Sequence, residues 1–142
     1  MSLAFAEAGS AELRGETPIG AVLVRDGTVI ASAGHRTREL NDPTAHAEMV
    51  VIREAAAKLG AERLVGCDLY VTLEPCAMCA GAIAHARLRR LYYAAPDPKG
   101  GAVDNGPRFF RQPTCHHAPE VYGGLRESEA AEMLRTFFAS RR

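Results

Sequence analysis

The spacing of apolar and polar residues predicts an N-terminal helix followed by a two-stranded hairpin. Residues 2–14 alternate small apolar residues with glutamates at roughly helical period. Residues 19–25 are apolar and β-branched, Asp26-Gly27 is a typical hairpin turn, and 28–33 is the expected returning strand. A polar loop over 34–41 then separates this first unit from the rest of the chain.

Two further helices are predicted from their end signals. Asp42-Pro43 combines a favourable N-cap with a proline suited to the first helical position, and Gly60 is the expected C-cap. A third strand follows at 69–73. Pro75 again fits the first turn of a helix, which is expected from Cys76 to about Ala86. The sequence from residue 42 to about residue 86 therefore predicts a helix, a strand and a second helix.

The remaining third of the chain predicts two strands and one helix. Residues 91–95 are the expected fourth strand, 120–122 a short fifth strand, and 127–140 the last helix. Residues 96–118 are rich in glycine and proline, and such a long irregular connection indicates a functional segment. Strands interleaved with helices predict one α/β domain over residues 1–142, with a mixed sheet of about five strands.

Composition and cysteine usage set the broad class. A chain of 142 residues can bury a core without disulfide or structural-metal support. Four cysteines, two of them in a Cys-x-x-Cys pair, do not resemble a secreted disulfide framework. No apolar run approaches the roughly 18 residues of a membrane span, and the N-terminus is a poor signal peptide. We therefore expect a cytoplasmic protein without a membrane anchor.

The charges are balanced overall but unevenly distributed. Lys plus Arg and Asp plus Glu both number 17, which argues against a strongly basic nucleic-acid binder. Residues 1–84 hold seven basic and eleven acidic residues, whereas residues 85–142 hold ten and six. The second part is thus positive, and this asymmetry permits a local phosphate-binding face.

The chemistry is carried by two short motifs about thirty residues apart. His46-Ala47-Glu48 supplies an imidazole and a carboxylate, and Cys76-Ala77-Met78-Cys79 supplies two thiols at i, i+3 spacing. We expect both motifs near helix starts, where the partial positive charge favours thiolates and where side chains lean off the helix end. His46, Cys76 and Cys79 are therefore the predicted ligands of one Zn²⁺ per chain, with the fourth position open for water.

The remaining carboxylate completes a hydrolytic mechanism. Zinc lowers the pKa of bound water to around 7, so that hydroxide is available at neutral pH to attack an amine-bearing ring carbon. Glu48 is not needed as a ligand, and we expect it to carry protons to a ring nitrogen and to departing ammonia. The combined pattern H-x-E…P-C-x-x-C is the signature of zinc nucleobase deaminases.

Less specific interpretations of these residues are weaker. A redox pair would need no His46, and a structural zinc site would need a fourth ligand. Candidates for that ligand are His85, Cys67, Cys115, His116 and His117. The adjacent residues 115–117 cannot all converge easily on one ion, so we interpret them as loop structure or an RNA contact. Cys67 is expected to be an inert packed thiol.

Three segments carry a resemblance to a known family: Ala45–Glu48, Val71–Ala82 and Asp97–Ala102. Together with the chain end, residues 137–142, they resemble bacterial tRNA-specific adenosine deaminases over essentially the whole chain. The resemblance implies a three-layer α/β/α fold of the cytidine-deaminase type and a homodimer. It also implies conversion of the wobble adenosine of a tRNA anticodon loop to inosine, with the ligand and proton-carrier roles given above.

The resemblance also assigns contacts to the substrate. Ile19 and the backbone around Ala47 would line the base pocket, Pro75 would adjoin it, and Asp97 and Lys99 would lie beside a flanking nucleotide. A carboxylate beside a phosphodiester makes sense if it accepts a hydrogen bond from a ribose 2′-hydroxyl, so Asp97 is expected to favour RNA over DNA.

One position departs from the family pattern. Where similar sequences carry asparagine in Gly-Asn-Arg, with its amide facing the base, this chain has His35. A neutral imidazole offers one donor and one acceptor, but a protonated one only donates. Because its ordinary pKa is near 6.5, we expect a His35-dependent pocket to lose selectivity or rate between about pH 7 and 5.5. The alternative without a role in base selection is that His35 points to solvent or packs on RNA.

Two other functions remain open at this point. A related deaminase could act on a free base, a nucleoside of guanine or cytosine type, or single-stranded DNA, and the altered residue at position 35 favours this reading. A non-catalytic zinc or RNA-binding module is disfavoured, because such a module has no use for Glu48.

Overall fold

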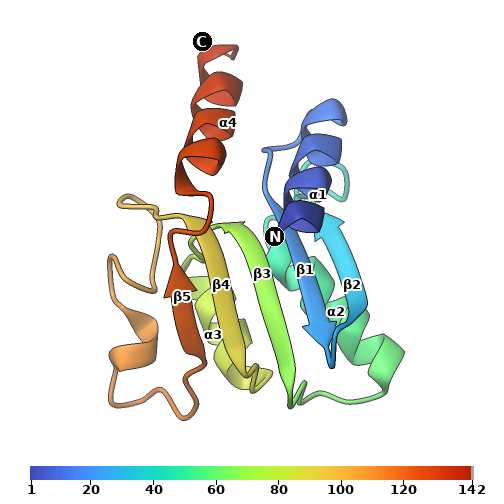
Figure 1. The fold of residues 1–142 in the computed structure, drawn as a ribbon, viewed down its shortest axis with the longest axis vertical. Helices are drawn as coiled ribbons and strands as arrows, with labels where there is room; N and C mark the ends of the chain where they lie inside the picture. The colour runs from blue at the N-terminus through green and yellow to red at the C-terminus, as the bar shows by residue number, and fades with distance from the viewer. Residues whose placement is uncertain (142) are drawn as a thin grey trace.

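A computed structural model describes residues 1–141 and centres on a mixed sheet of five strands (Figure 1). The strands are β1 (Gly20–Arg25), β2 (Thr28–Gly34), β3 (Cys67–Leu73), β4 (Arg90–Ala95) and β5 (Glu120–Gly123). Their order across the sheet is β2-β1-β3-β4-β5. β1 runs antiparallel to β2 and β3, whereas β3, β4 and β5 are parallel. The predicted mixed α/β sheet is thereby confirmed.

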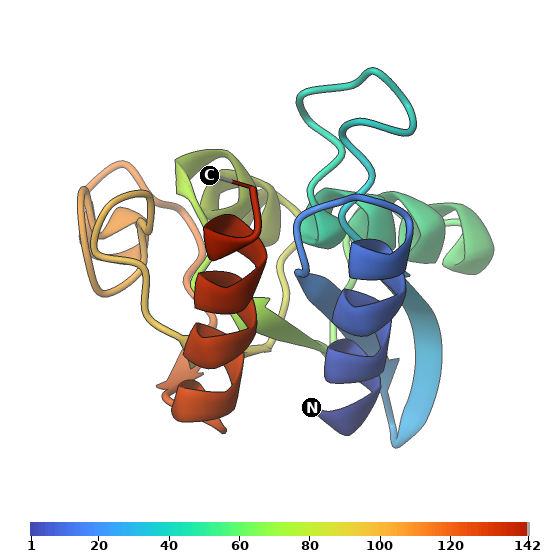
Figure 2. The same cartoon turned by 90° about the horizontal axis from the view of Figure 1, so that it is seen from above.

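Helices cover both faces of the sheet and give three layers (Figure 2). On one face lie α1 (Ser2–Leu13) and α4 (Glu127–Ala139), and on the other lie α2 (Ala47–Leu59) and α3 (Ala77–His85). The long connection after β4 contains only a short 3₁₀ turn, η1 (Phe109–Arg111). Arg142, the last basic residue of the chain, lies outside the described residues. None of the helices in the described part is long and apolar enough to cross a membrane.

The main core lies between the sheet and the α2/α3 layer. Leu23, Leu69, Val71, Ile83 and Leu91 are completely buried there. Because both faces of β3 are covered, five of its seven residues are buried, as expected for a central strand. The core thus holds α2 and α3 on one face of the sheet.

Glycines allow α1 to lie unusually close to the hairpin. A Cβ at Gly20 would lie 2.0 Å from the carbonyl oxygen of Ala4, and one at Gly34 would lie 2.7 Å from that of Glu7.

The predicted turn between β1 and β2 is also confirmed, because Asp26 and Gly27 both have positive φ, at 51° and 75°.

The predicted start of α2 is wrong by several residues. Asp42 does not cap the helix; its Oδ1 instead accepts hydrogen bonds from the backbone N–H and the hydroxyl of Thr44, at 2.8 and 2.7 Å. This local turn satisfies the carboxylate two residues on. The helix begins at Ala47, with His46 as an extended N-cap at φ −66° and ψ 152°. Gly60 is the predicted C-cap, at φ 64°.

The other element boundaries differ little from the prediction. α3 begins at Ala77, with Cys76 as its extended N-cap. β3 begins two residues earlier than predicted, at Cys67, which is buried in the core. Both proposed metal-binding motifs therefore begin at the N-cap of a helix.

Candidate active site

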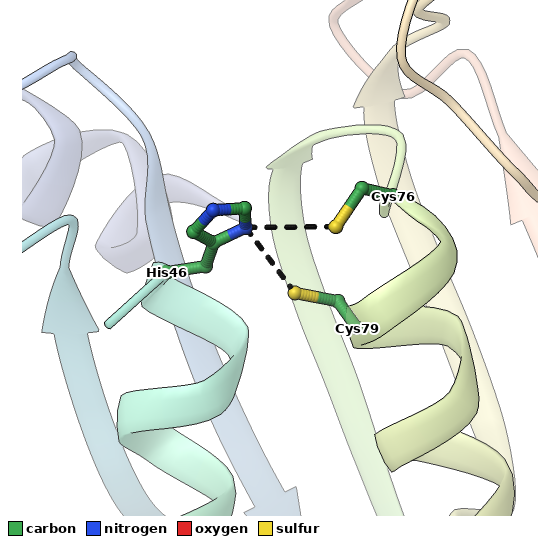
Figure 3. A group of neighbouring side chains, drawn as sticks. All are labelled: His46, Cys76 and Cys79. Atoms are coloured by element: carbon green, nitrogen blue, oxygen red, sulfur yellow. Dashed lines mark hydrogen bonds between the residues drawn. The ribbon is translucent and has the colours of Figure 1, made fainter. Parts of the chain in front are cut away.

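Two helix N-termini bring one imidazole and two thiols together (Figure 3). His46 Nδ1 lies 3.6 Å from Cys76 Sγ and 3.5 Å from Cys79 Sγ. The three ligand atoms all lie within 4.8 Å of one another. The residues come from the N-cap of α2, the N-cap of α3 and the first turn of α3. The predicted convergence of His46, Cys76 and Cys79 is confirmed.

The electrostatics of this cluster favour a cation. Hydrogen bonds from Cys79 and His46 lower the pKa of the Cys76 thiol well below its usual value, which favours the thiolate form. The hydrogen bond to that thiolate, together with burial, raises the pKa of Cys79. The hydrogen bond to Cys76 also raises the pKa of His46. A divalent cation among these groups would stabilise both thiolates and the neutral imidazole.

The donor set fits zinc. With Zn–S of about 2.3 Å and Zn–N of about 2.0 Å, tetrahedral ligands lie roughly 3.5–3.8 Å apart. The separations of His46 Nδ1 from the two sulfur atoms match that edge length. Three protein ligands, two of them soft thiolates, are typical of a catalytic zinc site with one position left for water or substrate.

Glu48 lies beside this cluster without belonging to it. Its side chain is only 4 % exposed, and burial raises the pKa of its carboxyl to about 7. Glu48, His46 and Cys76 line a cavity of about 290 Å³. A carboxyl with a pKa near neutrality can both accept and release a proton there, as general acid–base catalysis requires.

The predicted substrate residues are divided between this cavity and a neighbouring groove. Ile19, His35 and Asp97 line the cavity, and Lys99 lines the groove. Ala47 and Pro75 are buried directly after His46 and directly before Cys76. The side chains of Ala47 and Pro75 do not line the cavity.

The groove is larger and continues from the cavity, because both share Ile19, Leu73 and Asp97. Its volume is about 990 Å³. Among the described residues, three basic side chains line it: Lys99 after β4, Arg135 within α4 and Arg141 after α4. An apolar floor with cations along the wall suits a chain of nucleotides better than a single free base.

His35 is buried and points into the cavity, not to solvent. It is 9 % exposed, and its ring lies 4.8 Å from that of His46 between centroids. Its Nδ1 is the single buried side-chain nitrogen or oxygen without a hydrogen-bond partner in the described part of the chain. Burial, and next the neighbouring His46, lower the pKa of His35 to about 4. The imidazole is therefore neutral at pH 5.5, and the expected switch between pH 7 and 5.5 is wrong.

Sequence reasoning missed Glu74, which lines the cavity and is 2 % exposed. Burial alone would raise its pKa, but hydrogen bonds from Asp97, Asn105 and Val103 outweigh burial and hold the pKa below its usual value. These partners lie 23 to 31 residues later in the chain. The only local signal was an acidic residue directly before Pro75-Cys76.

Apart from His35, the other cysteines and histidines stay outside the site. Cys115 Sγ donates to the carbonyl of His117, and His117 Nε2 lies 2.8 Å from the carbonyl oxygen of Leu88. Within the described residues, His46, Cys76 and Cys79 form the one group arranged to hold a metal. Residues 115–117 therefore contribute loop structure. Cys67 is completely buried, and burial raises its pKa, as expected for an inert thiol.

The mixed sheet and the histidine–dithiol cluster with an adjacent buried carboxyl define a zinc-dependent deaminase. The model of the cytidine and deoxycytidylate deaminase zinc-binding region matches residues 1–95. A tRNA-specific adenosine deaminase of Agrobacterium fabrum is 70 % identical over 142 residues, covering the whole chain and 93 % of that protein. The chain belongs to the family of tRNA-specific adenosine deaminases.

Two further comparisons agree. A tRNA-specific adenosine deaminase of Bacillus subtilis is 48 % identical and is matched over 97 % of this chain and 86 % of that protein. A solved structure from work on A-to-I editing by tRNA:A34 deaminases superposes with a TM-score of 0.93 at 71 % identity. The superposition covers 94 % of this chain and 97 % of the chain in that structure.

Proposed function

We propose that this protein hydrolyses the wobble adenosine of a tRNA anticodon to inosine, releasing ammonia. The observation that carries the proposal is the cavity in which Glu48 meets the histidine–dithiol cluster, in a chain 70 % identical over its length to a tRNA-specific adenosine deaminase. A cytoplasmic location follows from a tRNA substrate.

The residues of the chain divide the chemistry among them. His46, Cys76 and Cys79 hold zinc, which when bound supplies a Lewis acid able to lower the pKa of water to about 7. Glu48 takes one proton from the attacking water and delivers it to the purine ring nitrogen, and it then carries the proton of the new hydroxyl group to the leaving amine. Water thus adds its oxygen to the ring carbon, and ammonia leaves with the proton.

His35 is proposed to contact the target base. A buried imidazole nitrogen without a partner is costly, and a substrate group can satisfy it. The comparison that tests this role is His35→Asn. We expect the variant to convert adenosine better relative to cytosine in the same RNA, because an amide offers a donor and an acceptor side by side. Identical adenosine-to-cytosine ratios in the two proteins would refute the contact.

Asp97 is proposed to select RNA. Its Oδ1 already accepts the backbone N–H groups of Lys99 and Gly100, at 3.1 and 3.0 Å, which leaves Oδ2 to accept from a ribose 2′-hydroxyl. We expect Asp97→Asn to relax the preference for RNA over a DNA of the same sequence. The same RNA-to-DNA ratio in variant and wild type would show that Asp97 has no such role.

The direct test of the function compares substrates. The zinc-loaded protein is incubated with anticodon stem-loops carrying A34, with the matching DNA hairpin, and with free guanine, cytosine and cytidine; ammonia and inosine are measured. We expect much faster turnover of stem-loop RNA than of any other substrate, and none with Glu48→Ala. Faster turnover of a free base or of single-stranded DNA than of any stem-loop would establish the alternative deaminase function instead.

We also propose that the protein is a homodimer, formed through the outer surface of α3. This helix carries no charged residue before its last position, and its outward residues Met78, Gly81 and Ala82 are only partly buried. A helix apolar on all sides needs cover on all sides, and a second copy of the chain can provide it. Ala82→Glu should sediment as a monomer, whereas Ala57→Glu, at an exposed position of α2, should not change the sedimenting mass. A monomeric wild type would refute the dimer.

A further inference from the structure

The carboxylate of Glu74 accepts hydrogen bonds from several residues of the connection that follows β4. Its Oε1 accepts hydrogen bonds from the backbone N–H of Asp97 at 2.9 Å and from Asn105 Nδ2 at 2.7 Å. Its Oε2 accepts three successive backbone N–H groups, those of Val103, Asp104 and Asn105, at 3.0, 2.9 and 3.1 Å. Successive N–H groups on one oxygen form an anion-binding nest. Here the anion is a side chain of the same protein.

The backbone around this carboxylate leaves little space. A Cβ at Gly101 would lie 2.6 Å from Glu74 Cδ and 2.5 Å from the carbonyl oxygen of Asp97. The backbone N–H of Glu74 also bonds to the carbonyl of Ala95 at 2.8 Å, and the carbonyl of Pro75 accepts from Ala102 at 2.9 Å. Segment 97–105 is thus wound around Glu74 and tied to the chain on both sides of it.

This segment is also a wall of the substrate site. Asp97 and Gly100 line the cavity, and Lys99 lines the groove. Only Pro75 separates Glu74 from Cys76, at the N-cap of α3. One carboxylate therefore joins the wall expected to contact RNA to the helix start that carries the thiols.

We infer that Glu74 is a positioning residue: it holds segment 97–105 in the shape that accepts the nucleotides beside the target base. The inference rests on the proposed function for the identity of those nucleotides. Glu74 sets the affinity for the RNA chain; zinc binding and the hydrolytic step belong to other residues. Displacement of a substrate-binding wall by as little as an ångström can have large kinetic effects.

Glu74→Gln separates these roles with a change of very few atoms. An amide has a single acceptor oxygen, so its NH₂ group must face either the two donors at Oε1 or the three at Oε2. Two or three hydrogen bonds are lost, and N–H donors are left facing one another at a position that is only 2 % exposed. The segment should loosen while α3 and its thiols remain in place.

The expected result is a split between kinetic parameters. On an A34 stem-loop, Glu74→Gln should raise KM about tenfold, as for loss of a hydrogen bond to a charged group, and lower kcat less than about threefold. Zinc content should stay at one per chain. Because one side of the group no longer accepts, either the backbone amide of Asp97 or those of Val103 and Asp104 should exchange with deuterium at least about tenfold faster.

Asp68→Asn is the matched control. Asp68 lies at the other end of β3, is 8 % exposed, and pairs with Arg89 at 2.7 Å. Its neutralisation should lower thermal stability without changing KM or the exchange of the Val103 amide. Asn105→Ala, which removes one of the five donors to Glu74, should give an intermediate KM and guards against a Glu74 variant that fails to fold.

Each outcome decides the inference. An unchanged KM, equal KM increases in Glu74→Gln and Asp68→Asn, or unchanged exchange at all of Asp97, Val103 and Asp104 would overturn it. A wild-type protein that converts no stem-loop would instead refute the proposed function. In that event the amide exchange still shows whether Glu74 orders the segment.

Discussion

At the scale of single residues, Glu48 and Cys76 line one cavity but have different tasks. Glu48→Ala should retain one zinc per chain, because no ligand is removed, and should lose about 10²–10⁴-fold in kcat with the proton carrier. Cys76→Ala should lose both zinc and turnover, since a ligand and a thiolate disappear together. Metal analysis and initial rates on the same preparations measure both effects.

Two results would contradict this assignment. Turnover near the wild-type rate in Glu48→Ala would show that another group carries the proton. Full zinc content in Cys76→Ala would show that the ion is held elsewhere. Cys115→Ala is the matched control for loss of a thiol, and we expect it to change neither quantity, because Cys115 bonds only within its own loop.

His35 gives a prediction about pH and stability. Its pKa is about 4 in the folded protein and near 6.5 when unfolded, so the folded state disfavours its protonation. Its contribution to stability is complete above pH 6.5 and is lost as the pH falls toward 4. Asparagine does not titrate. The free energy of unfolding of His35→Asn, relative to wild type, should therefore rise on going from pH 7 to pH 5, by at most about 1.4 kcal/mol per pH unit.

Urea unfolding of the two proteins at pH 7, 6 and 5 measures this difference. Groups that titrate in both proteins, including those at the metal site, cancel in the comparison. A difference that does not change with pH would show that His35 is solvated and titrates normally.

At this scale, the sequence alone could predict a residue's role only where its partners lie at short, characteristic spacing along the chain. His46, Glu48 and the two thiols were predictable, because the chemistry of zinc restricts residue types at short spacing. Glu74 was not, because its five donors come from 97–105 and become visible only when that segment is folded. The burial of His35 depends in the same way on distant packing.

At the scale of elements, the hydrophobic pattern located the helices and strands but not every end. The start of α2 was misplaced because Asp42 followed by Pro43 satisfies the rules for a helix cap and for a local turn equally well. The structure uses the turn, and the helix begins after His46. Because the helix begins after His46, the imidazole lies at the helix N-terminus beside Cys76. The boundary that differs from the prediction is therefore the one that positions a metal ligand.

The packing of α1 on the hairpin yields a pair of glycine predictions with opposite signs. Gly20→Ala places a methyl group 2.0 Å from the carbonyl oxygen of Ala4, so α1 must move away, and we expect a loss of about 1–3 kcal/mol or more. Gly9→Ala, within α1, meets nothing within 4 Å and should stabilise the protein by about 0.5–1 kcal/mol through helix propensity. Thermal unfolding of both variants checks this; equal effects would show that α1 is not closely packed.

At the scale of the whole molecule, charge and topology combine at one end of the sheet. The strand order could not be predicted, because β3, β4 and β5 pair in parallel through long crossovers, and one crossover is the irregular segment before β5. The consequence is that Lys99, which follows β4, and Arg141, which follows α4, line one groove. A chain with zero net charge thereby acquires a local basic surface next to its catalytic cavity.

This surface predicts how RNA binding depends on salt. Each cation that neutralises a phosphate of a single strand contributes about 0.7 to the slope of log affinity against log salt concentration. In a Glu48→Ala background, which prevents turnover, Lys99→Ala should reduce the slope for an A34 stem-loop by about that amount and weaken all stem-loops alike. Lys58→Ala carries the same change in net charge but lies at the end of α2, outside the groove. We expect it to leave the slope unchanged. Equal slopes for the two variants would mean that RNA senses only the total charge of the protein, and the groove would then not be its path.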